Sequence, residues 1–273
     1  MAKYILILGV LMSLLIRIFF ISQSKHTADI YLMYTMGASF LTGQNPYLSL
    51  DFNSYPPLAI FLEVASMLIS AYLHVSFVTV FKFWPNLADF ISAFLIYKFL
   101  IKTKTSPLNA TLWSTFFLLN PISIIISSAH GQIDSITSLF VLLAIFTLTI
   151  YSKKLFLYLS ALFLGLAIAF KPNPAMLIPL FILYRKITVA QRITYLILVS
   201  VHLIVLMIPF LGQNSDLVIY KMLSYSGVND LSYSAILRGI WYQNNALTTL
   251  PLSSELLNGS KFIFTTAAFS LTF

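Results

Sequence analysis

The chain of 273 residues contains no cysteine and very few charged side chains. The absence of cysteine excludes disulfides, thiolate metal sites and cysteine nucleophiles. Charged residues make up 9% of the sequence, whereas ordinary soluble domains contain about a quarter, so a water-soluble enzyme is excluded. Apolar side chains are abundant instead, at 59%, and they form runs long enough to cross roughly 30 Å of hydrocarbon.

These runs predict an all-α fold, a polytopic integral membrane helical bundle of about eight spans. The first run, 4–22, is too long for a signal-peptide core and is expected to be a retained anchor. The others are 86–101, 107–126, 135–150, 155–170, 174–184, 193–211 and 262–273. Because the last run stops in mid-span, we expect a single transmembrane domain, 1–273, that is incomplete at its C-terminus.

The positions of the basic residues predict the orientation of the spans. If the stretch 57–80 does not cross, the basic clusters share one side, as the positive-inside rule requires: Lys3; Lys98, Lys102 and Lys104; Lys153 and Lys154; and Arg185, Lys186 and Arg192. If it crosses, Lys3 lies opposite the others. We therefore expect an interfacial helix within a first exterior loop, 23–83, and a second long exterior loop at 212–258. The net charge of +8 then reflects topology, and no nucleic-acid partner is expected.

Some polar residues inside the apolar runs are expected to be structural. Arg17 and Asp89 lie near the outer ends of their spans and can pair as a bridge. Four residues of the stretch 57–80 form a polar stripe at helical spacing, namely Glu63, Ser66, Ser70 and His74. Such a stripe is typical of a helix that lies along an interface or lines a wet cavity.

Other polar groups gather at helix ends on the predicted exterior face, where several ionisable side chains together indicate a site. In chain order they are Asp29, the segment 43–47 (GQNPY), the segment 55–58 (YPPL), Asn120-Pro121, the segment 130–134 (HGQID) and Lys171-Pro172. Their order and spacing resemble the GT-C superfamily of polyprenyl-phosphate-sugar-dependent glycosyltransferases. The mannosyltransferase branch related to the second mannosyltransferase of GPI-anchor assembly is the most similar. The resemblance covers about residues 17–180.

The resemblance implies an integral membrane, inverting glycosyltransferase that works on the extracytoplasmic or lumenal face. The membrane would be the plasma membrane of a prokaryote or the endoplasmic reticulum of a eukaryote. The enzyme would move a hexose, with mannose favoured, from a polyprenyl-phosphate-linked donor to a glycan, glycolipid or protein acceptor. The motifs are shared by enzymes with different donors, so they do not identify the sugar.

Asp29 occupies the position at which the family carries its general base, which accepts the proton of the attacking hydroxyl. The alternative is a helix cap or a solvated loop carboxylate. Asp51 is a second catalytic candidate, and its alternative is an Asx turn. If both carboxylates reach the site, they could hold a divalent cation. No other cofactor is implied, and no zinc site is expected because the four histidines lack ligand spacing.

The remaining candidates are assigned to substrate binding. His130, Gln132 and Asp134 would bind sugar hydroxyls or phosphate, unless they form a polar turn in which Asp134 caps the next helix. Lys171 would stabilise charge on the leaving phosphate, unless it only extends to the lipid headgroups. Tyr55 opens a matching motif, and Arg238 could contribute a guanidinium to the phosphate.

Two other functions fit a polytopic chain with buried charges. A lipid or solute transporter, or a flippase, would carry polar groups in the membrane, but transporters tend to have repeated halves, and no repeat is visible. A non-catalytic subunit of a glycan-assembly complex would use the same fold to hold a partner.

Overall fold

The structure is a computed structural model that describes residues 2–23, 27–50, 55–150, 153–183, 187–212 and 214–223. All of them belong to one compact unit, Met1–Ser224. Every regular element in the described residues is a helix, and none of them forms a strand, so the all-α class is confirmed. The predicted span 262–273 and the site candidates Asp51 and Arg238 lie outside the described residues.

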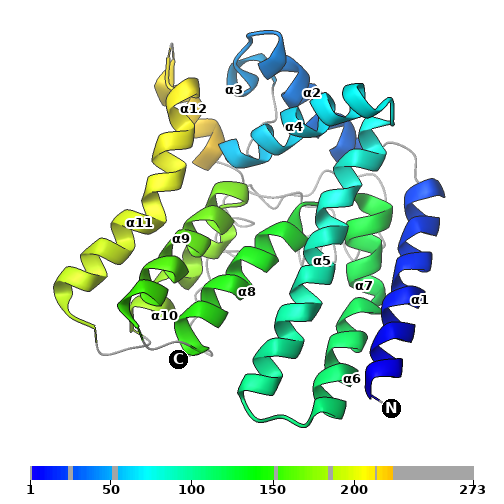
Figure 1. Ribbon diagram of the computed structural model, residues 1–273. Coiled ribbons are helices and arrows are strands. Elements are labelled where there is room, and N and C mark those ends of the chain that lie inside the picture. Colours follow the sequence, from blue (N-terminus) through cyan, green and yellow to red (C-terminus); the bar gives the residue numbers. More distant parts are fainter. Residues whose placement is uncertain are drawn as a thin grey trace, which may run out of the picture. The chain divides into compact units, whose positions relative to one another are not determined.

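Six helices form a row in which each helix contacts the next (Figure 1). In spatial order they are α1 (Ala2–Gln23), α6 (Pro107–Leu118), α5 (Phe77–Lys102), α8 (Asp134–Ile150), α9 (Lys154–Phe170) and α11 (Val189–Met207). The row follows from the composition, because helices with apolar side chains on most faces have many surfaces on which to pack.

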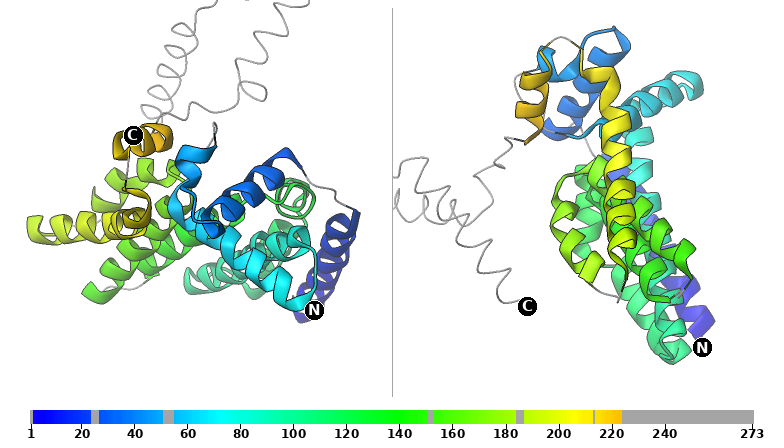
Figure 2. Two further views of the ribbon diagram at one scale, coloured as in Figure 1. Left: turned by 90° about the horizontal axis from the view of Figure 1, so that it is seen from above. Right: turned by 90° about the vertical axis from the view of Figure 1, so that its left-hand side faces the viewer.

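Four other helices lie at one end of this row, the upper end in Figure 1. They are α2 (Ala28–Leu41), α3 (Pro46–Ser49), α4 (Pro57–Leu73) and α12 (Ser215–Leu223). Helix α4 crosses the ends of the long helices, as both views in Figure 2 also show, and it contacts α2, α5, α9 and α11. The start of α1, the turn between α5 and α6, and the start of α9 lie at the opposite end.

The predicted interfacial helix 57–80 is shorter than expected. Helix α4 ends at Leu73, and α5 begins at Phe77. His74 adopts the left-handed conformation with φ 53° and ends α4, and the Ser76 side chain accepts a hydrogen bond from the Thr79 amide to start α5. The hydrophobic pattern did not show this break, because a turn between two helices leaves the apolar composition of the stretch unchanged. The cap residues, and not the composition, end one helix and start the next.

The polar stripe of α4 was predicted to face an interface or a wet cavity, and for half of it this prediction is wrong. Glu63 and Ser66 are buried, at 1% and 0% exposure, and the Trp84 indole N–H of α5 donates to Ser66 Oγ over 3.0 Å. A Cβ built at Gly37 of α2 would lie 3.1 Å from Glu63 Cβ. This half of the stripe therefore faces α2 and α5 instead of water, while His74 at its far end is exposed.

The predicted span 107–126 is interrupted. Helix α6 ends at Leu118, and Asn120 caps the short helix α7 (Pro121–Ile124) by accepting a hydrogen bond from the Ile122 amide. A π-helix, η1 (Ile125–His130), continues from it, and the two halves meet at an angle of 41°. Pro121 lacks the amide hydrogen that a continuous helix would need there, so the chain breaks and restarts.

Two described helices, Ala2–Gln23 and Val189–Phe210, are long and apolar enough to cross a membrane. The bent pair Pro107–Leu118 and Pro121–His130 would add a third if it acts as one span. Three of the shorter apolar helices correspond to other predicted runs, namely Asp134–Ile150, Lys154–Phe170 and Asn173–Leu183, and the fourth, Pro57–Leu73, corresponds to the predicted interfacial helix. A bundle of about eight spans therefore stays a prediction.

Candidate functional site

Asp29 lies in the first turn of α2, where the partial positive charge of a helix N-terminus favours a carboxylate. The cap of this helix is Thr27, whose side-chain oxygen accepts a hydrogen bond from the Ile30 amide over 3.3 Å. Thr27 Oγ1 also donates to the His130 carbonyl over 3.3 Å. Since Thr27 performs the capping, the alternative reading of Asp29 as a helix cap does not apply.

The segment 130–134 forms a tight turn that faces Asp29. The π-helix ends at Gly131, which has φ 78°, and the amides of Gly131 and Gln132 both donate to the Ile126 carbonyl, over 2.9 and 3.0 Å. A Cβ built at Gly131 would lie 2.8 Å from Ile30 Cδ1. Both the backbone conformation and the lack of space therefore require glycine here.

This turn brings two side chains to one oxygen of Asp29. The Gln132 side-chain amide donates to Asp29 Oδ2, and His130 Nδ1 lies 3.4 Å from the same oxygen. The side chains of His130 and Asp29 are 48% and 39% exposed, so solvent or a ligand can reach them. A carboxylate between an imidazole and an amide at a surface is held in position and is still open to a substrate.

Lys171 and Asp134 form the second part of the site. Lys171 follows the last residue of α9, and Asp134 is the first residue of α8. Their charged atoms lie 2.7 Å apart, with side chains 20% and 44% exposed. The Lys171 ammonium is thus held at the helix ends by a partner, and neither expected alternative, a simple helix cap at Asp134 or an unpaired lysine reaching the headgroups, describes this pair.

Tyr55 connects the two parts. Its hydroxyl donates to Gln132 Oε1 over 3.5 Å, and Lys171 Nζ lies 5.9 Å from the centroid of its ring. The Tyr47 hydroxyl donates to the Tyr55 carbonyl over 2.7 Å, which ties Tyr55 to α3. The contacts therefore run from Asp29 through Gln132 and Tyr55 to Lys171.

The structure thus brings together six residues that the sequence proposed for the site, and we call them the Asp29 cluster. They are Asp29, Tyr55, His130, Gln132, Asp134 and Lys171. The other two proposed residues, Asp51 and Arg238, lie outside the described residues. Within the part of the chain that the structure describes, no three metal-binding side chains lie close enough to hold a metal ion.

The expected bridge between Arg17 and Asp89 is confirmed. The Arg17 guanidinium and the Asp89 carboxylate lie 2.7 Å apart, and their side chains are 1% and 3% exposed. Arg17 also donates to Asn86 Oδ1 over 3.0 Å and to Ser123 Oγ over 2.9 Å. This pair is a structural contact, because both side chains are almost fully buried and are bonded to neighbouring helices.

Sequence reasoning did not predict the burial of two ionisable groups. Lys82 is fully buried, and its ammonium donates to the Ala129 carbonyl over 2.6 Å. Glu63 is buried with both carboxylate oxygens lacking a hydrogen-bond partner, and burial raises its pKa well above the ordinary value. The spacing of Lys82, Asn86 and Asp89 on one face of α5 is a signal that could have identified Lys82 in advance.

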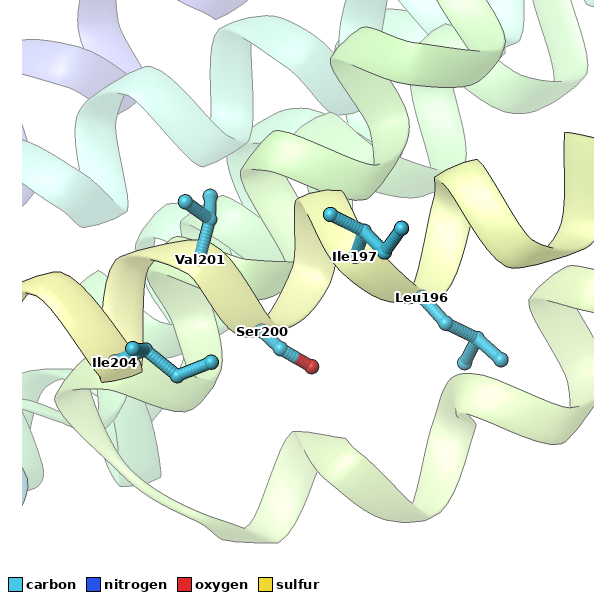
Figure 3. Close-up of a pocket in the computed structure, with 5 residues that line it drawn as sticks. All are labelled: Leu196, Ile197, Ser200, Val201 and Ile204. Carbon is cyan, nitrogen blue, oxygen red and sulfur yellow. The ribbon is translucent and has the colours of Figure 1, made fainter.

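The described pockets are apolar. A groove of about 560 Å³ lies between α1 and α5 and includes Arg17 and Asn86 in its wall. A second, of about 310 Å³, is lined by five residues of α11 and no ionisable side chain (Figure 3). The first groove adjoins the segment that leads to His130, because Asn86 in its wall also donates to the Ser127 carbonyl.

No protein-family model matches the chain, and no solved structure matches it.

Proposed function

We propose that the protein is an integral membrane, inverting glycosyltransferase that moves a hexose, with mannose favoured, from a polyprenyl-phosphate donor to an acceptor outside the cytoplasm. The observation that carries this proposal is the Asp29 cluster. It combines an accessible carboxylate, held by His130 and Gln132, with a lysine at the other end of the same chain of contacts. Glycosyl transfer from a lipid phosphate calls for both functions, a base for the proton of the acceptor hydroxyl and a cation for the departing phosphate.

Asp29 would act as the general base. The acceptor hydroxyl attacks the anomeric carbon as its proton passes to the Asp29 carboxylate, so that the hydroxyl gains nucleophilic character as it attacks. The new C–O bond forms on the face opposite the lipid phosphate, and the bond to the phosphate oxygen breaks with its electron pair. The configuration at the anomeric carbon is inverted in this single displacement.

Lys171 would stabilise the negative charge that develops on the departing phosphate. A lysine ammonium is a compact cation, and its electrostatic effect is larger where water is scarce. Asp134 holds this ammonium in place over 2.7 Å in the absence of substrate. The His130 imidazole and the Gln132 amide, which already contact Asp29, would bind hydroxyls of the sugar or the acceptor.

The arrangement of the helices supports a membrane location with the cluster outside. The start of α1, the turn between α5 and α6, and the start of α9 lie at one end of the row (Figure 1). The sequence places basic clusters there, including Lys102 and Lys154, and the positive-inside rule assigns that end to the cytoplasm. The apolar groove between α1 and α5 would accept the hydrocarbon chain of the donor.

The test is transfer of radiolabelled mannose from polyprenyl-phosphate-mannose in membranes that contain the protein. Asp29→Asn should lower the rate by about 10²- to 10⁴-fold, because the amide cannot accept the proton. Asp216→Asn is the matched control, since Asp216 also lies in a first helical turn, that of α12. Lys171→Ala should lower the rate by about 10²-fold, with Lys154→Ala at the opposite end of α9 as its control.

Two results would overturn the proposal. Full activity in both Asp29→Asn and Lys171→Ala would remove the roles assigned to the cluster. No transfer by the unaltered protein from any polyprenyl-phosphate sugar would favour a lipid or solute transporter, a flippase, or a non-catalytic subunit of a glycan-assembly complex. The subunit reading would also predict that changes to the cluster affect assembly with a partner and leave transfer by that partner intact.

A further inference from the structure

Helix α5 directs a polar stripe at the segment that precedes the tight turn 130–134, which we call the site turn. Asp89 accepts hydrogen bonds from Ser123 Oγ and Ser127 Oγ, over 2.8 and 2.6 Å. One turn earlier, Asn86 donates to the Ser127 carbonyl over 3.2 Å and accepts from Ser128 Oγ over 2.6 Å. One turn earlier again, Lys82 donates to the Ala129 carbonyl over 2.6 Å. The stripe therefore ends one residue before His130.

The Lys82 side chain lies directly behind the turn. A Cβ built at Gly131 would lie 3.0 Å from both Cγ and Cε of Lys82. Gly131 separates His130 from Gln132, the two residues that contact Asp29 Oδ2. The stem of Lys82 thus supports the middle of the turn, while its ammonium holds the carbonyl that leads into it.

A charged group at this position needs an explanation other than stability. Removing an ammonium from water is costly unless it is paired, and the ion pairs among the described residues do not include Lys82. An apolar side chain of similar volume would fill the same space without that cost. The feature that methionine would lack is the N–H donor to the Ala129 carbonyl.

We propose that Lys82 is a positioning residue for the transfer reaction, which sets where His130 and Gln132 meet Asp29. This inference rests on the proposed function, because it assigns Lys82 a role through the proposed base. Lys82 is 0% exposed, so it acts through the turn and does not touch substrate. Its loss should misplace the turn, and a misplacement of about 1 Å can lower a rate by about 10²-fold.

The first test measures geometry and does not depend on activity. Because the chain contains no cysteine, the pair Asp29→Cys and Gln132→Cys provides two unique thiols, and a short bifunctional thiosulfonate reports how readily they are joined. Adding Lys82→Met should slow cross-linking markedly. Adding Lys98→Met, which removes an exposed lysine from the other half of α5, should leave it unchanged.

The second test measures mannose transfer in the protein with Asp29 and Gln132 intact. Lys82→Met should lower kcat with little change in KM, Lys82→Arg should recover part of the loss because it restores a charged donor, and Lys98→Met should have no effect. Lys82→Gln keeps an N–H donor without the charge, so its kcat should resemble that of Lys82→Arg, and a loss as large as in Lys82→Met would contradict the role of the donor.

The outcomes separate the two proposals. Slower cross-linking in Lys82→Met, with no transfer activity in any form of the protein, would uphold the positioning of the turn and overturn the glycosyltransferase proposal. Unchanged cross-linking in Lys82→Met would overturn the positioning role, whatever the transfer assay reports. Equal losses of kcat in the methionine and arginine variants would also count against it, because they would indicate a general packing defect.

Discussion

Two ion pairs of the same length serve different parts of the molecule. Arg17 with Asp89 and Lys171 with Asp134 are both separated by 2.7 Å, but the first pair is 1% and 3% exposed and the second is 20% and 44% exposed. The buried pair has further partners inside the protein, including Ser123 and Asn86. The exposed pair is open to solvent and adjoins Tyr55 in the Asp29 cluster. Burial, and not distance, distinguishes a structural contact from a candidate binding group.

The strongest test of this comparison is to break the buried pair. Arg17→Met leaves the Asp89 carboxylate buried without its cation, which should cost about 3–5 kcal/mol. The expected result is a large fall in the aggregation temperature of the detergent-solubilised protein. The double variant Arg17→Met, Asp89→Leu removes both charges and should recover much of the loss. A single variant as stable as the unaltered protein would contradict the structural role.

A smaller effect is expected at the glycine of the site turn. Gly131→Ala places a methyl group 2.8 Å from Ile30 Cδ1 in a left-handed conformation, and we expect a cost of about 1–3 kcal/mol. Gly43 is the matched control, because it has the same φ of 78° and nothing within 4 Å of a built Cβ. The aggregation temperature of the detergent-solubilised protein should fall less in Gly43→Ala than in Gly131→Ala. Equal losses would mean that close packing against Ile30 contributes nothing.

The smallest effect on stability is expected at the exposed pair. Asp134→Asn removes a partly exposed charge, and such pairs contribute about 0–1 kcal/mol. The aggregation temperature should therefore change little, whereas kcat/KM for the lipid-linked donor should fall about tenfold because Lys171 loses the group that holds it. A large loss of stability without a change in kcat/KM would reverse the assignment of the two pairs.

Much of the site could be anticipated from motif positions. Asp29, His130, Gln132 and Lys171 were proposed from segments far apart in the chain, and the structure places them in one chain of contacts with Tyr55. Their catalytic and binding roles are still predictions, as are those of Asp51 and Arg238. The pairing of Arg17 with Asp89 was also foreseen, because two opposite charges at similar depth have few other partners.

The breaks at His74 and Asn120 were not foreseen. Both positions lie within runs whose hydropathy is continuous, so composition predicted one helix where the structure has two. After the break at Asn120 the chain forms a π-helix that ends at His130, and a π-helix often marks a functional site. The capping side chains and Pro121 mark where the helices end, but hydropathy averaged over a window of residues conceals these positions.

The sequence by itself determined the all-α class, the apolar character of the helices and the segregation of basic residues, since these depend on composition and spacing along the chain. Only the tertiary structure decided which polar residues meet. Lys82 could have faced solvent, and Asp134 could have been a simple cap, until packing buried the first behind Gly131 and placed the second against Lys171. Contacts between distant segments depend on how helices pack, and packing is not encoded in any one segment.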